Sequence, residues 1–316
     1  MNKTLVTGGL GLVGSAFKEE LKDAIFPSKQ ELNLLNREQV FDYISSSKID
    51  TIIHVAAKVG GVGANMAYMN SFYSENIQMN TNVIDACIQN NIKQLVCFLS
   101  TCIYPSEKYV QFPLTEEQLH KGEPHESNFG YAYAKRMVDI HLRAVKEQYG
   151  LNYMSVIPNN LYGKHDNFNL ENAHVLPALI RKIWESKLNS SSSFEVWGDG
   201  EIYREFTYSS DIVKIILFCL ENYKKIEPIN IGNTKEYLLK DVISLICKEL
   251  EYDGEIFYNK SKPKGQIRKP TSNKKLLDLG WKEEEYTSLR DGIKYTCDWF
   301  KDNYPNVRGY SEYNRN

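Results

Sequence analysis

A glycine-rich segment near the amino terminus constrains the fold of this chain more than any other feature. It follows an apolar run at residues 4–6, and its glycines satisfy both Gly8-x-x-Gly11-x-x-Gly14 and Gly9-x-Gly11-x-x-Gly14. One glycine allows a tight turn, one lets backbone amides approach a pyrophosphate, and the last lets a helix pack close to the strand. Free N–H groups at the start of that helix favour an anion. The segment therefore predicts a dinucleotide-binding turn; the alternative is an ordinary tight strand-to-helix turn.

Apolar runs and amphipathic stretches alternate through the first half of the chain. Strand-like runs cover residues 4–6, 24–26, 51–55, 94–99 and 154–157, and helix-like stretches cover 13–21, 37–45, 77–89 and 131–149. Such alternation predicts right-handed βαβ units and a doubly wound parallel α/β sheet of the Rossmann type. After about residue 163 the alternation fades. We therefore predict a Rossmann domain over 1–165, with returns of the chain near 205–232, and a smaller mixed α/β lobe with irregular segments over 166–316.

Composition limits the class of protein. The 316 residues carry 38 Lys and Arg against 40 Asp and Glu, for a formal net charge of −2. Without a basic excess, neither nucleic acid nor an anionic membrane is an expected partner. The amino terminus has no apolar stretch that suits an export signal, and no run is long enough to span a bilayer. Six cysteines without paired spacing predict reduced thiols in the cytoplasm and no metal cluster.

The segment after the second predicted strand bears on which dinucleotide is bound. Enzymes that use NAD usually place a carboxylate there, where it binds the ribose 2′-hydroxyl. This chain has Ser28 and Lys29 instead, and a hydroxyl beside an ammonium suits a 2′-phosphate. We therefore predict NADP(H) as the cofactor, bound through Lys29. The alternative is that Lys29 is a solvated surface charge.

A tyrosine and a lysine four residues apart are candidates for proton transfer. Tyr131 and Lys135 fall on one face of a predicted helix, and the ammonium is expected to lower the pKa of the phenol. Such a tyrosine can pass a proton to the oxygen of a carbonyl group. Ser100 follows the predicted strand 94–99, and ligands bind at the carboxyl ends of parallel strands. We expect Ser100 to orient the carbonyl group by a hydrogen bond.

Together these motifs resemble the extended short-chain dehydrogenases/reductases, and more narrowly the GDP-L-fucose synthase family. Members of that family epimerise and reduce GDP-4-keto-6-deoxy-mannose. The narrower resemblance is carried by the segments AKVGG at 57–61, STCIYP at 100–105, NLYG at 160–163, HVLPAL at 174–179 and KPTSN at 269–273. It runs over nearly the whole chain, and it implies a Rossmann fold, NADP(H) and a GDP-4-keto sugar.

The resemblance also implies roles for individual residues. It assigns reduction to Ser100, Tyr131 and Lys135, and an acid/base pair for epimerisation to Cys102 and His174. The implied cofactor contacts are Gly8, Gly9, Leu10, Gly11, Leu12, Val13, Gly14, Lys29, Phe98, Leu99, Thr101, Pro158, Asn159, Asn160 and Leu161. The implied substrate contacts are Lys182, Trp197, Arg204 and Ser272. For Cys102 and Trp197 the alternative is a place in the core, for His174 a structural role, and for Arg204 an ion pair.

Three positions depart from the family pattern. An arginine usual in the glycine turn is Leu10 here, which removes one expected phosphate contact. The arginine of the substrate lobe is Lys182, which keeps the charge but loses the forked guanidinium. Gly63 stands where a larger residue is usual, so the loop over the sugar is expected to be roomier, which widens the range of sugars to consider.

The main prediction is an oxidoreductase and isomerase that uses NADPH to reduce C4 of a GDP-4-keto sugar and inverts C3 and C5. Such a reaction belongs to GDP-sugar and polysaccharide biosynthesis. One alternative is a C4-reductase of a related GDP-4-keto heptose or 6-deoxy-heptose without epimerase activity. Another is a nucleotide-sugar 4-epimerase or dehydratase; Thr101 and Cys102 disfavour a dehydratase, which typically has an acidic residue there. The intact catalytic trio argues against a dinucleotide sensor without activity. We expect a homodimer formed through the predicted helices 77–89 and 131–149.

Overall fold

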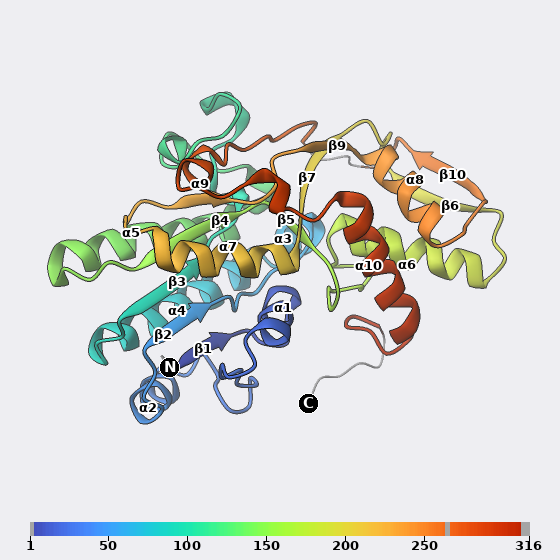
Figure 1. Ribbon diagram of the computed structural model, residues 1–316. Coiled ribbons are helices and arrows are strands. Elements are labelled where there is room, and N and C mark those ends of the chain that lie inside the picture. The colour runs from blue at the N-terminus through green and yellow to red at the C-terminus, as the bar shows by residue number, and fades with distance from the viewer. Residues whose placement is uncertain (1–2, 263–265, 311–316) are drawn as a thin grey trace.

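A five-stranded parallel sheet lies at the centre of the larger part of the molecule. The computed structural model describes residues 3–262 and 266–310 (Figure 1). The strand order is β1-β2-β3-β4-β8, and every pairing is parallel. The strands are β1 (Thr4–Thr7), β2 (Thr51–His54), β3 (Gln94–Phe98), β4 (Met154–Pro158) and β8 (Ile229–Ile231). This arrangement confirms the predicted fold class.

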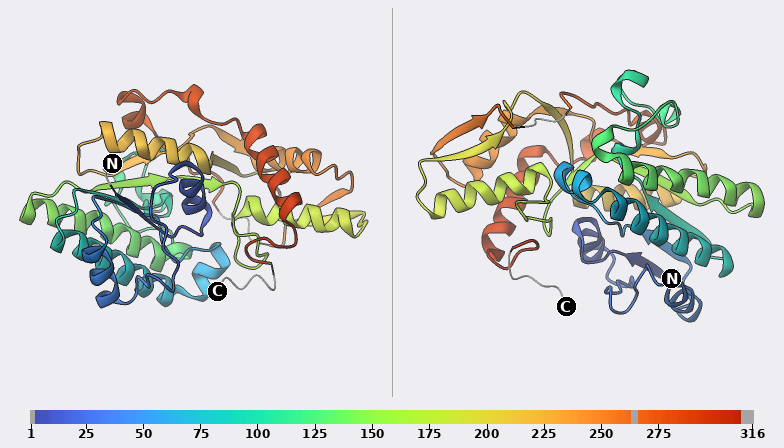
Figure 2. Two further views of the ribbon diagram at one scale, coloured as in Figure 1. Left: turned by 60° about the horizontal axis from the view of Figure 1, so that its bottom comes forward. Right: turned by 180° about the vertical axis from the view of Figure 1, so that it is seen from behind.

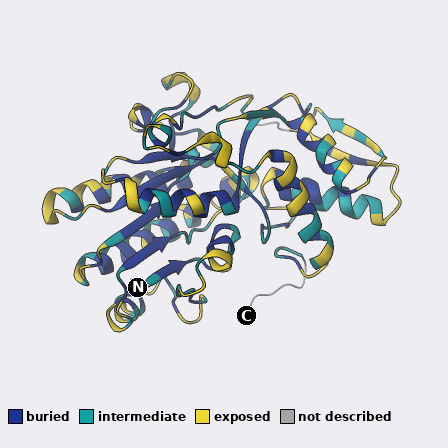
Figure 3. Cartoon of the chain, in the orientation of Figure 1, coloured by how far each residue is buried: buried dark blue, intermediate teal, exposed yellow. Residues whose placement is uncertain are grey.

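Helices cover both faces of the sheet (Figures 1 and 2). One face carries α2 (Arg37–Ser46), α4 (Met69–Gln89) and α5 (Phe129–Tyr149), and the other carries α1 (Leu12–Glu20) and α7 (Ser209–Asn222). Successive side chains of a strand point to opposite faces, so Leu5 enters the first core and Val6 the second. Because both faces are covered, the strands are buried throughout (Figure 3), which accounts for their continuous apolar runs.

The smaller lobe has its own core, formed mainly by α6 (Val175–Leu188), α8 (Leu239–Glu249) and α10 (Leu289–Asn303). Strands β6 (Ser193–Trp197) and β10 (Glu255–Asn259) form a parallel pair beside these helices. A three-stranded sheet joins β5 (Asn160–Tyr162), β7 (Tyr203–Tyr208) and β9 (Glu236–Leu238). The short helices α3 (Val62–Ala67) and α9 (Lys274–Asp278) complete the elements used below.

The chain returns to the large sheet after leaving it. Helix α7 packs on α1, and β8 pairs with β4 through Val156 and Ile229. Both elements fall within or close to the predicted returns near 205–232. The division of the chain at residue 165 itself stays a prediction. None of the described helices has the length and apolar character needed to cross a membrane, and all six cysteines are free.

Two expectations about local structure are wrong. The second lobe is more regular than predicted, because α6 carries buried residues at helical spacing, among them Leu176, Leu179 and Ile183. The run 24–26 is not a full strand: Ile25 makes one bridge to Leu5. Ile25 N donates to Thr4 O at 2.8 Å and Ile25 O accepts from Val6 N at 2.9 Å. The ladder ends there because Pro27 has no N–H to continue it.

Candidate active site

The glycine turn forms a close backbone cradle between β1 and α1. Gly8 has a positive φ of 74°, and a β-carbon there would lie 2.9 Å from Ala56 Cα. A β-carbon on Gly14 would lie 2.1 Å from Gly8 O, so this approach of helix to turn needs glycine. Gly11 N donates to Gly8 O at 3.0 Å, and no side chain caps the start of α1. Open N–H groups at a helix start and a cradle without side chains fit the pyrophosphate of a dinucleotide.

The other predicted residues of the turn differ in their surroundings. The side chain of Leu10 is exposed, whereas Val13 packs into the core beneath α1 and α7. Leu12 is the first residue of α1 and is half-buried. Backbone groups of this turn, more than its side chains, are therefore placed to meet a ligand.

Lys29 lies just past the single bridge at Ile25, and its side chain is exposed. Its neighbour Ser28 is tied to Glu31 in both directions: Ser28 N donates to Glu31 Oε2 at 2.7 Å, and Glu31 N donates to Ser28 Oγ at 3.3 Å. These hydrogen bonds lower the pKa of Glu31. Ser28 thus shapes the turn, and Lys29 supplies the cation at this edge of the sheet.

Ser100, Tyr131 and Lys135 come from the end of β3 and the first turns of α5. The Lys135 side chain is buried, and its Nζ donates to Phe98 O at 2.7 Å. Burial lowers the pKa of Lys135 to about 8. Burial raises the pKa of Tyr131, the nearby Cys102 raises it further, and a hydrogen bond with Ser100 acts in the opposite direction.

The expected lowering of the Tyr131 pKa is therefore wrong for the structure as it stands. Spacing on a helix places Lys135 one turn from Tyr131, but the ammonium is bonded to Phe98 O instead of supporting a phenolate. Burial disfavours the charged form of the phenol. Tyr131 consequently keeps its proton and is suited to donate it.

Cys102 lies beside this trio, in the short 3-10 helix Thr101–Ile103 that follows Ser100. Its backbone N donates to Ser100 Oγ at 3.2 Å. The thiol also interacts electrostatically with Lys269, whose pKa is lowered by burial and by the positive charge of Arg204. Lys269 thus brings Arg204 into the surroundings of Cys102. Lys269 belongs to the motif KPTSN at 269–273, for which the sequence predicted a role only at Ser272.

His174 immediately precedes α6, on a segment that reaches back toward Tyr131. Gly61 N donates to Asn172 O at 2.9 Å, and a β-carbon on Gly60 would lie 3.2 Å from Phe72 Cζ. The rings of Phe72 and Tyr131 meet edge to face, with centroids 6.5 Å apart. This series of contacts links the His174 segment to Tyr131. The side chain of His174 is exposed at the surface. The protein atoms around the ring and the positive charge of Arg308 lower its pKa.

The glycine-rich loop between β2 and α4 leaves room at one position. A β-carbon on Gly63 would meet no atom within 4 Å, whereas one on Gly61 would lie 2.9 Å from Ala173 O. The segment is therefore packed closely at Gly61, whereas Gly63 is an exposed position of α3. A roomier loop over the sugar stays a prediction.

The predicted cofactor residues after β4 have other partners. Asn159 Nδ2 donates to Asn233 O at 2.8 Å, and Asn159 Oδ1 accepts from Thr207 Oγ1 at 2.6 Å. Asn160 Nδ2 donates to Glu205 O at 2.8 Å. These amide groups hold the end of β4 against β7.

The rest of this predicted set lies at or just beyond the carboxyl ends of β3 and β4. Pro158 ends β4, and Leu161 follows it in β5. Phe98 ends β3, with Leu99 and Thr101 beyond it. The cofactor roles of all the residues at these two strand ends stay predictions.

The predicted nucleotide-sugar residues fall into two groups. Trp197 is 53% exposed, and the ammonium groups of Lys182 and Lys262 lie 5.8 and 5.4 Å from its ring centroid. An aromatic face with two cations beside it suits a stacked base and a diphosphate. Lys262 was missed by the sequence analysis, because nothing in its local sequence distinguishes it from a surface lysine.

Ser272 lies apart from that platform. Its backbone N donates to Leu114 O at 2.9 Å, and its hydroxyl accepts from Lys274 N at 3.4 Å. Asn230 of β8 donates to Ser272 O at 2.9 Å. Ser272 therefore helps to attach the segment before α9 to the large sheet, and the structure does not bring it to Trp197.

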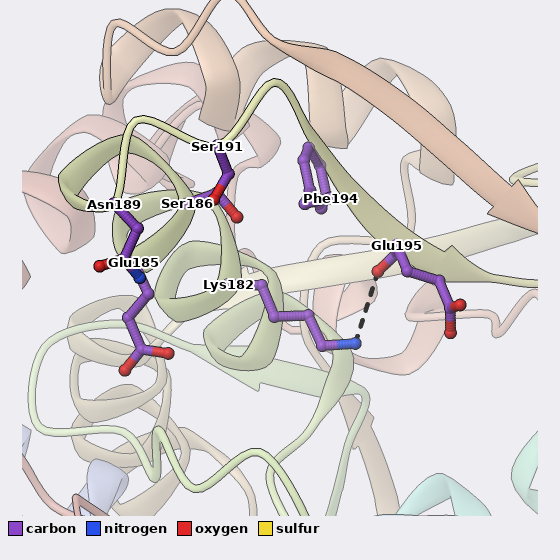
Figure 4. A pocket seen from close by; sticks show the side chains of 7 residues that line it. All are labelled: Lys182, Glu185, Ser186, Asn189, Ser191, Phe194 and Glu195. Atoms are coloured by element: carbon purple, nitrogen blue, oxygen red, sulfur yellow. Dashed lines mark hydrogen bonds between the residues drawn. The ribbon is translucent and has the colours of Figure 1, made fainter.

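A shallow pocket of about 320 Å³ lies beside Lys182, between α6 and β6 (Figure 4). It is lined by Lys182, Glu185, Ser186, Asn189, Ser191, Phe194 and Glu195. Lys182 Nζ donates to Glu195 O at 3.5 Å across its edge. None of the catalytic trio lines this pocket. Over residues 3–262 and 266–310, no group of three His, Cys, Asp or Glu side chains is placed to hold a metal ion.

A glycine cradle and a Ser-Tyr-Lys trio at the carboxyl ends of parallel strands define a dinucleotide-dependent reductase or epimerase. Residues 4–232 match the NAD dependent epimerase/dehydratase family. A GDP-L-fucose synthase from Dictyostelium discoideum is 39% identical over 313 residues, which cover 96% of this chain and 97% of that protein. The chain belongs to the NAD dependent epimerase/dehydratase family and, within it, to the GDP-L-fucose synthase family.

Solved structures agree with this placement. A GDP-L-fucose synthetase from Naegleria fowleri bound to NADP has a TM-score of 0.90 and 36% identity, covering 97% of this chain and 95% of that one. A GDP-6-OMe-4-keto-L-xylo-heptose reductase from C. jejuni has a TM-score of 0.86 and 28% identity, covering 95% of this chain and 98% of that one.

Proposed function

We propose that this protein uses NADPH to reduce the C4 ketone of a GDP-4-keto sugar and also epimerises C3 and C5. The observation that carries the proposal is the place of Cys102 next to Ser100 and Tyr131. The segment of His174 supports it, because that segment contacts the glycine loop that packs on Phe72, the ring neighbour of Tyr131. Its relatives include a GDP-L-fucose synthase from Dictyostelium discoideum and a GDP-L-fucose synthetase from Naegleria fowleri that is bound to NADP.

The cofactor fits the residues present. The close packing at Gly8 and Gly14 requires glycine and leaves the N–H groups at the start of α1 without a side-chain cap, open to a pyrophosphate. Lys29 supplies a cation for a 2′-phosphate. When bound, NADPH supplies a hydride for the sugar carbonyl. The absence of a carboxylate at residues 28–29 supports NADP(H) over NAD(H).

The nucleotide part of the substrate fits the smaller lobe. Trp197 offers an exposed ring for the base, with Lys182 and Lys262 positioned for the diphosphate. Lys269 interacts electrostatically with both Cys102 and Arg204, which supports a place for these two cations near the sugar. These cationic groups match the negative charge of a nucleoside diphosphate.

In the reductive step, Ser100 orients the C4 carbonyl and Tyr131 gives its proton to the oxygen. The raised pKa of Tyr131 keeps that proton in place until negative charge develops on the oxygen. The hydrogen bond from Lys135 to Phe98 O ties the start of α5 to the end of β3. It thereby holds Tyr131 and Ser100 in their relative positions.

Epimerisation uses the same oxygen. A ketone at C4 acidifies the hydrogens at C3 and C5, and removing one gives an enolate whose charge lies on the C4 oxygen beside Ser100 and Tyr131. Inversion then requires a proton to return from the opposite face of the ring. Cys102 follows β3, whereas His174 begins α6 in the smaller lobe. Two groups from separate segments suit opposite faces of one ring.

A C4-reductase of a GDP-4-keto heptose is the second candidate. We base it on Gly63, an exposed position of α3 with open space around it, where a larger sugar would find room. The heptose reductase from C. jejuni shares the overall fold at 28% identity. The two candidates share the reductive trio and differ in whether the Cys102 and His174 pair acts.

We also propose a cytoplasmic homodimer. The outer sides of α4 and α5 expose Met69, Tyr73, Phe129, Met137 and Ile140, each between 38% and 46%. Two copies of this helix pair would bury these side chains as a four-helix bundle. Sedimentation should give twice the 36.5 kDa chain mass, and the double variant Met137→Glu/Ile140→Glu should sediment as a single chain. The six free thiols support the cytoplasmic location.

Substrate-dependent oxidation of NADPH tests the activity. The purified protein should oxidise NADPH when GDP-4-keto-6-deoxy-mannose is added and should not do so with the UDP-linked sugar. Oxidation with a GDP-4-keto heptose alone would favour the second candidate. A protein that retained tightly bound nucleotide and turned over without added NADPH would contradict the reductase assignment.

A further inference from the structure

Arg308 lies beside the glycine turn, although nearly three hundred residues separate them in the sequence. A β-carbon built on Gly11 would lie 3.8 Å from Arg308 Nη1. Gly11 immediately precedes α1, at the point where the pyrophosphate of a dinucleotide meets the open N–H groups of the helix. The chain therefore returns a guanidinium group to the cradle from the segment that follows α10.

That segment is firmly attached to the smaller lobe. Phe168 N donates to Arg308 O at 2.8 Å, and Arg181 Nη1 donates to Gly309 O at 3.2 Å. The side chain of Val307 is buried in the lobe core. Gly309 has a φ of 88°, and a β-carbon there would lie 2.3 Å from Asn167 Oδ1, so this close turn needs glycine. The backbone of Arg308 is thus held in place on both sides.

The guanidinium group of Arg308 has unused hydrogen-bonding capacity. It donates no hydrogen bond to any residue within 3–262 and 266–310, and it is only partly exposed. Arg308 interacts electrostatically with Asp166, whose buried Oδ2 accepts no hydrogen bond from the described residues. A partly buried guanidinium with five free donors is costly unless an anion is bound beside it.

We propose that Arg308 binds the pyrophosphate of the nicotinamide cofactor. The inference rests on the proposed use of NADP(H). Arg308 reaches the turn at Gly11 from the segment that follows α10. Asp166 orients the guanidinium by charge without occupying its donors.

The cofactor fits this arginine better than the substrate does. The platform proposed for the nucleotide sugar lies at Trp197 on β6 and is flanked by its own lysines. Arg308 instead adjoins Gly11 and the segment of His174. It therefore joins the smaller lobe to the cofactor turn, and cofactor binding is expected to tighten the contact between the two.

Binding of three nucleotides to Arg308→Gln tests the proposal without any turnover. NADP⁺ and ADP-ribose both carry a pyrophosphate, whereas adenosine 2′-monophosphate carries the 2′-phosphate and no pyrophosphate. Loss of a charge-assisted hydrogen bond should weaken the binding of NADP⁺ and of ADP-ribose by the same factor, about 10- to 100-fold. Adenosine 2′-monophosphate should bind within about twofold of the parent. Calorimetry on the full chain measures all three affinities.

Two further variants make the result specific. Arg308→Lys should recover part of the affinity, because it keeps the charge but loses the fork. Arg290→Gln removes the same charge from an exposed position on α10 and should change none of the three affinities. Unchanged affinity of Arg308→Gln for NADP⁺ would overturn the proposal, as would an equal loss for all three nucleotides. A parent protein that bound neither NADP⁺ nor NAD⁺ would instead overturn the proposed function itself.

Discussion

Replacing Lys135 by methionine should separate the stability of this protein from its activity. The amine is buried and its pKa is lowered from 10.5 to about 8. A lowering of this size corresponds to about 3 kcal/mol that the folded state loses when the amine is charged. Methionine removes this cost, but it also leaves the buried Phe98 O without the donor that now lies at 2.7 Å, which costs about 1–3 kcal/mol. At pH 7 the Lys135→Met variant should therefore be about as stable as the parent, while its reductase activity falls by about 10²-fold or more.

The pH dependence gives the sharper test. Between about pH 8 and 10.5 the unfolded chain binds more protons at Lys135 than the folded chain does, so the free energy of unfolding rises with pH across that window. Between pH 7 and pH 9.5 the free energy of unfolding of the parent should therefore rise by about 2 kcal/mol relative to that of Lys135→Met. Urea titrations at several pH values measure both proteins, with Lys146→Met on the same helix as the control. If the free energies of unfolding of the parent and of Lys135→Met changed in parallel with pH, the reasoning would be refuted.

Three further variants test the cofactor turn and the proton donor. Tyr131→Phe should reduce the keto sugar about 10²- to 10⁴-fold more slowly and still bind NADP⁺ within a few-fold; near-parental reduction would remove Tyr131 from its role. Lys29→Glu should weaken the binding of NADPH about 10- to 100-fold and that of NADH far less. Equal increases in the Michaelis constants for the two cofactors would contradict a contact between Lys29 and the 2′-phosphate. Gly14→Ala should abolish NADP⁺ binding and cost about 1–3 kcal/mol of stability, because the new methyl group would lie 2.1 Å from Gly8 O. Gly63→Ala is its control and should change neither NADP⁺ binding nor stability, because a β-carbon there meets no atom within 4 Å.

The large sheet could be predicted from sequence because its strands are buried on both faces. Apolar runs such as 51–55 and 94–99 leave no other place for those side chains, and the glycine turn fixes how the first strand joins the first helix. The exception was the run 24–26, where Pro27 stops the ladder after one bridge. The strand-end position of Ser100 could be predicted for the same reason.

The properties that depend on distant segments could not be read from the chain. Helical spacing placed Tyr131 and Lys135 on one face, but the pKa of Tyr131 is governed by burial and by Cys102. The position of Arg308 beside Gly11 could not be predicted from the residues around it. It depends on the turn at Gly309 and on the backbone hydrogen bond to Phe168, far away in the sequence. Ser272 was grouped with the substrate residues by its motif, and the structure attaches it to Leu114 instead.

Incorporation of deuterium tests the epimerase-reductase assignment most directly. GDP-4-keto-6-deoxy-mannose should be incubated with the protein in D₂O without NADPH, and a GDP-4-keto heptose in parallel. We expect deuterium to enter at C3, C5 or both, with Cys102→Ser slowing the exchange strongly and Cys247→Ser leaving it unchanged. Reduction on adding NADPH, with no prior uptake of deuterium from either sugar, would contradict the account and leave the protein a C4-reductase alone.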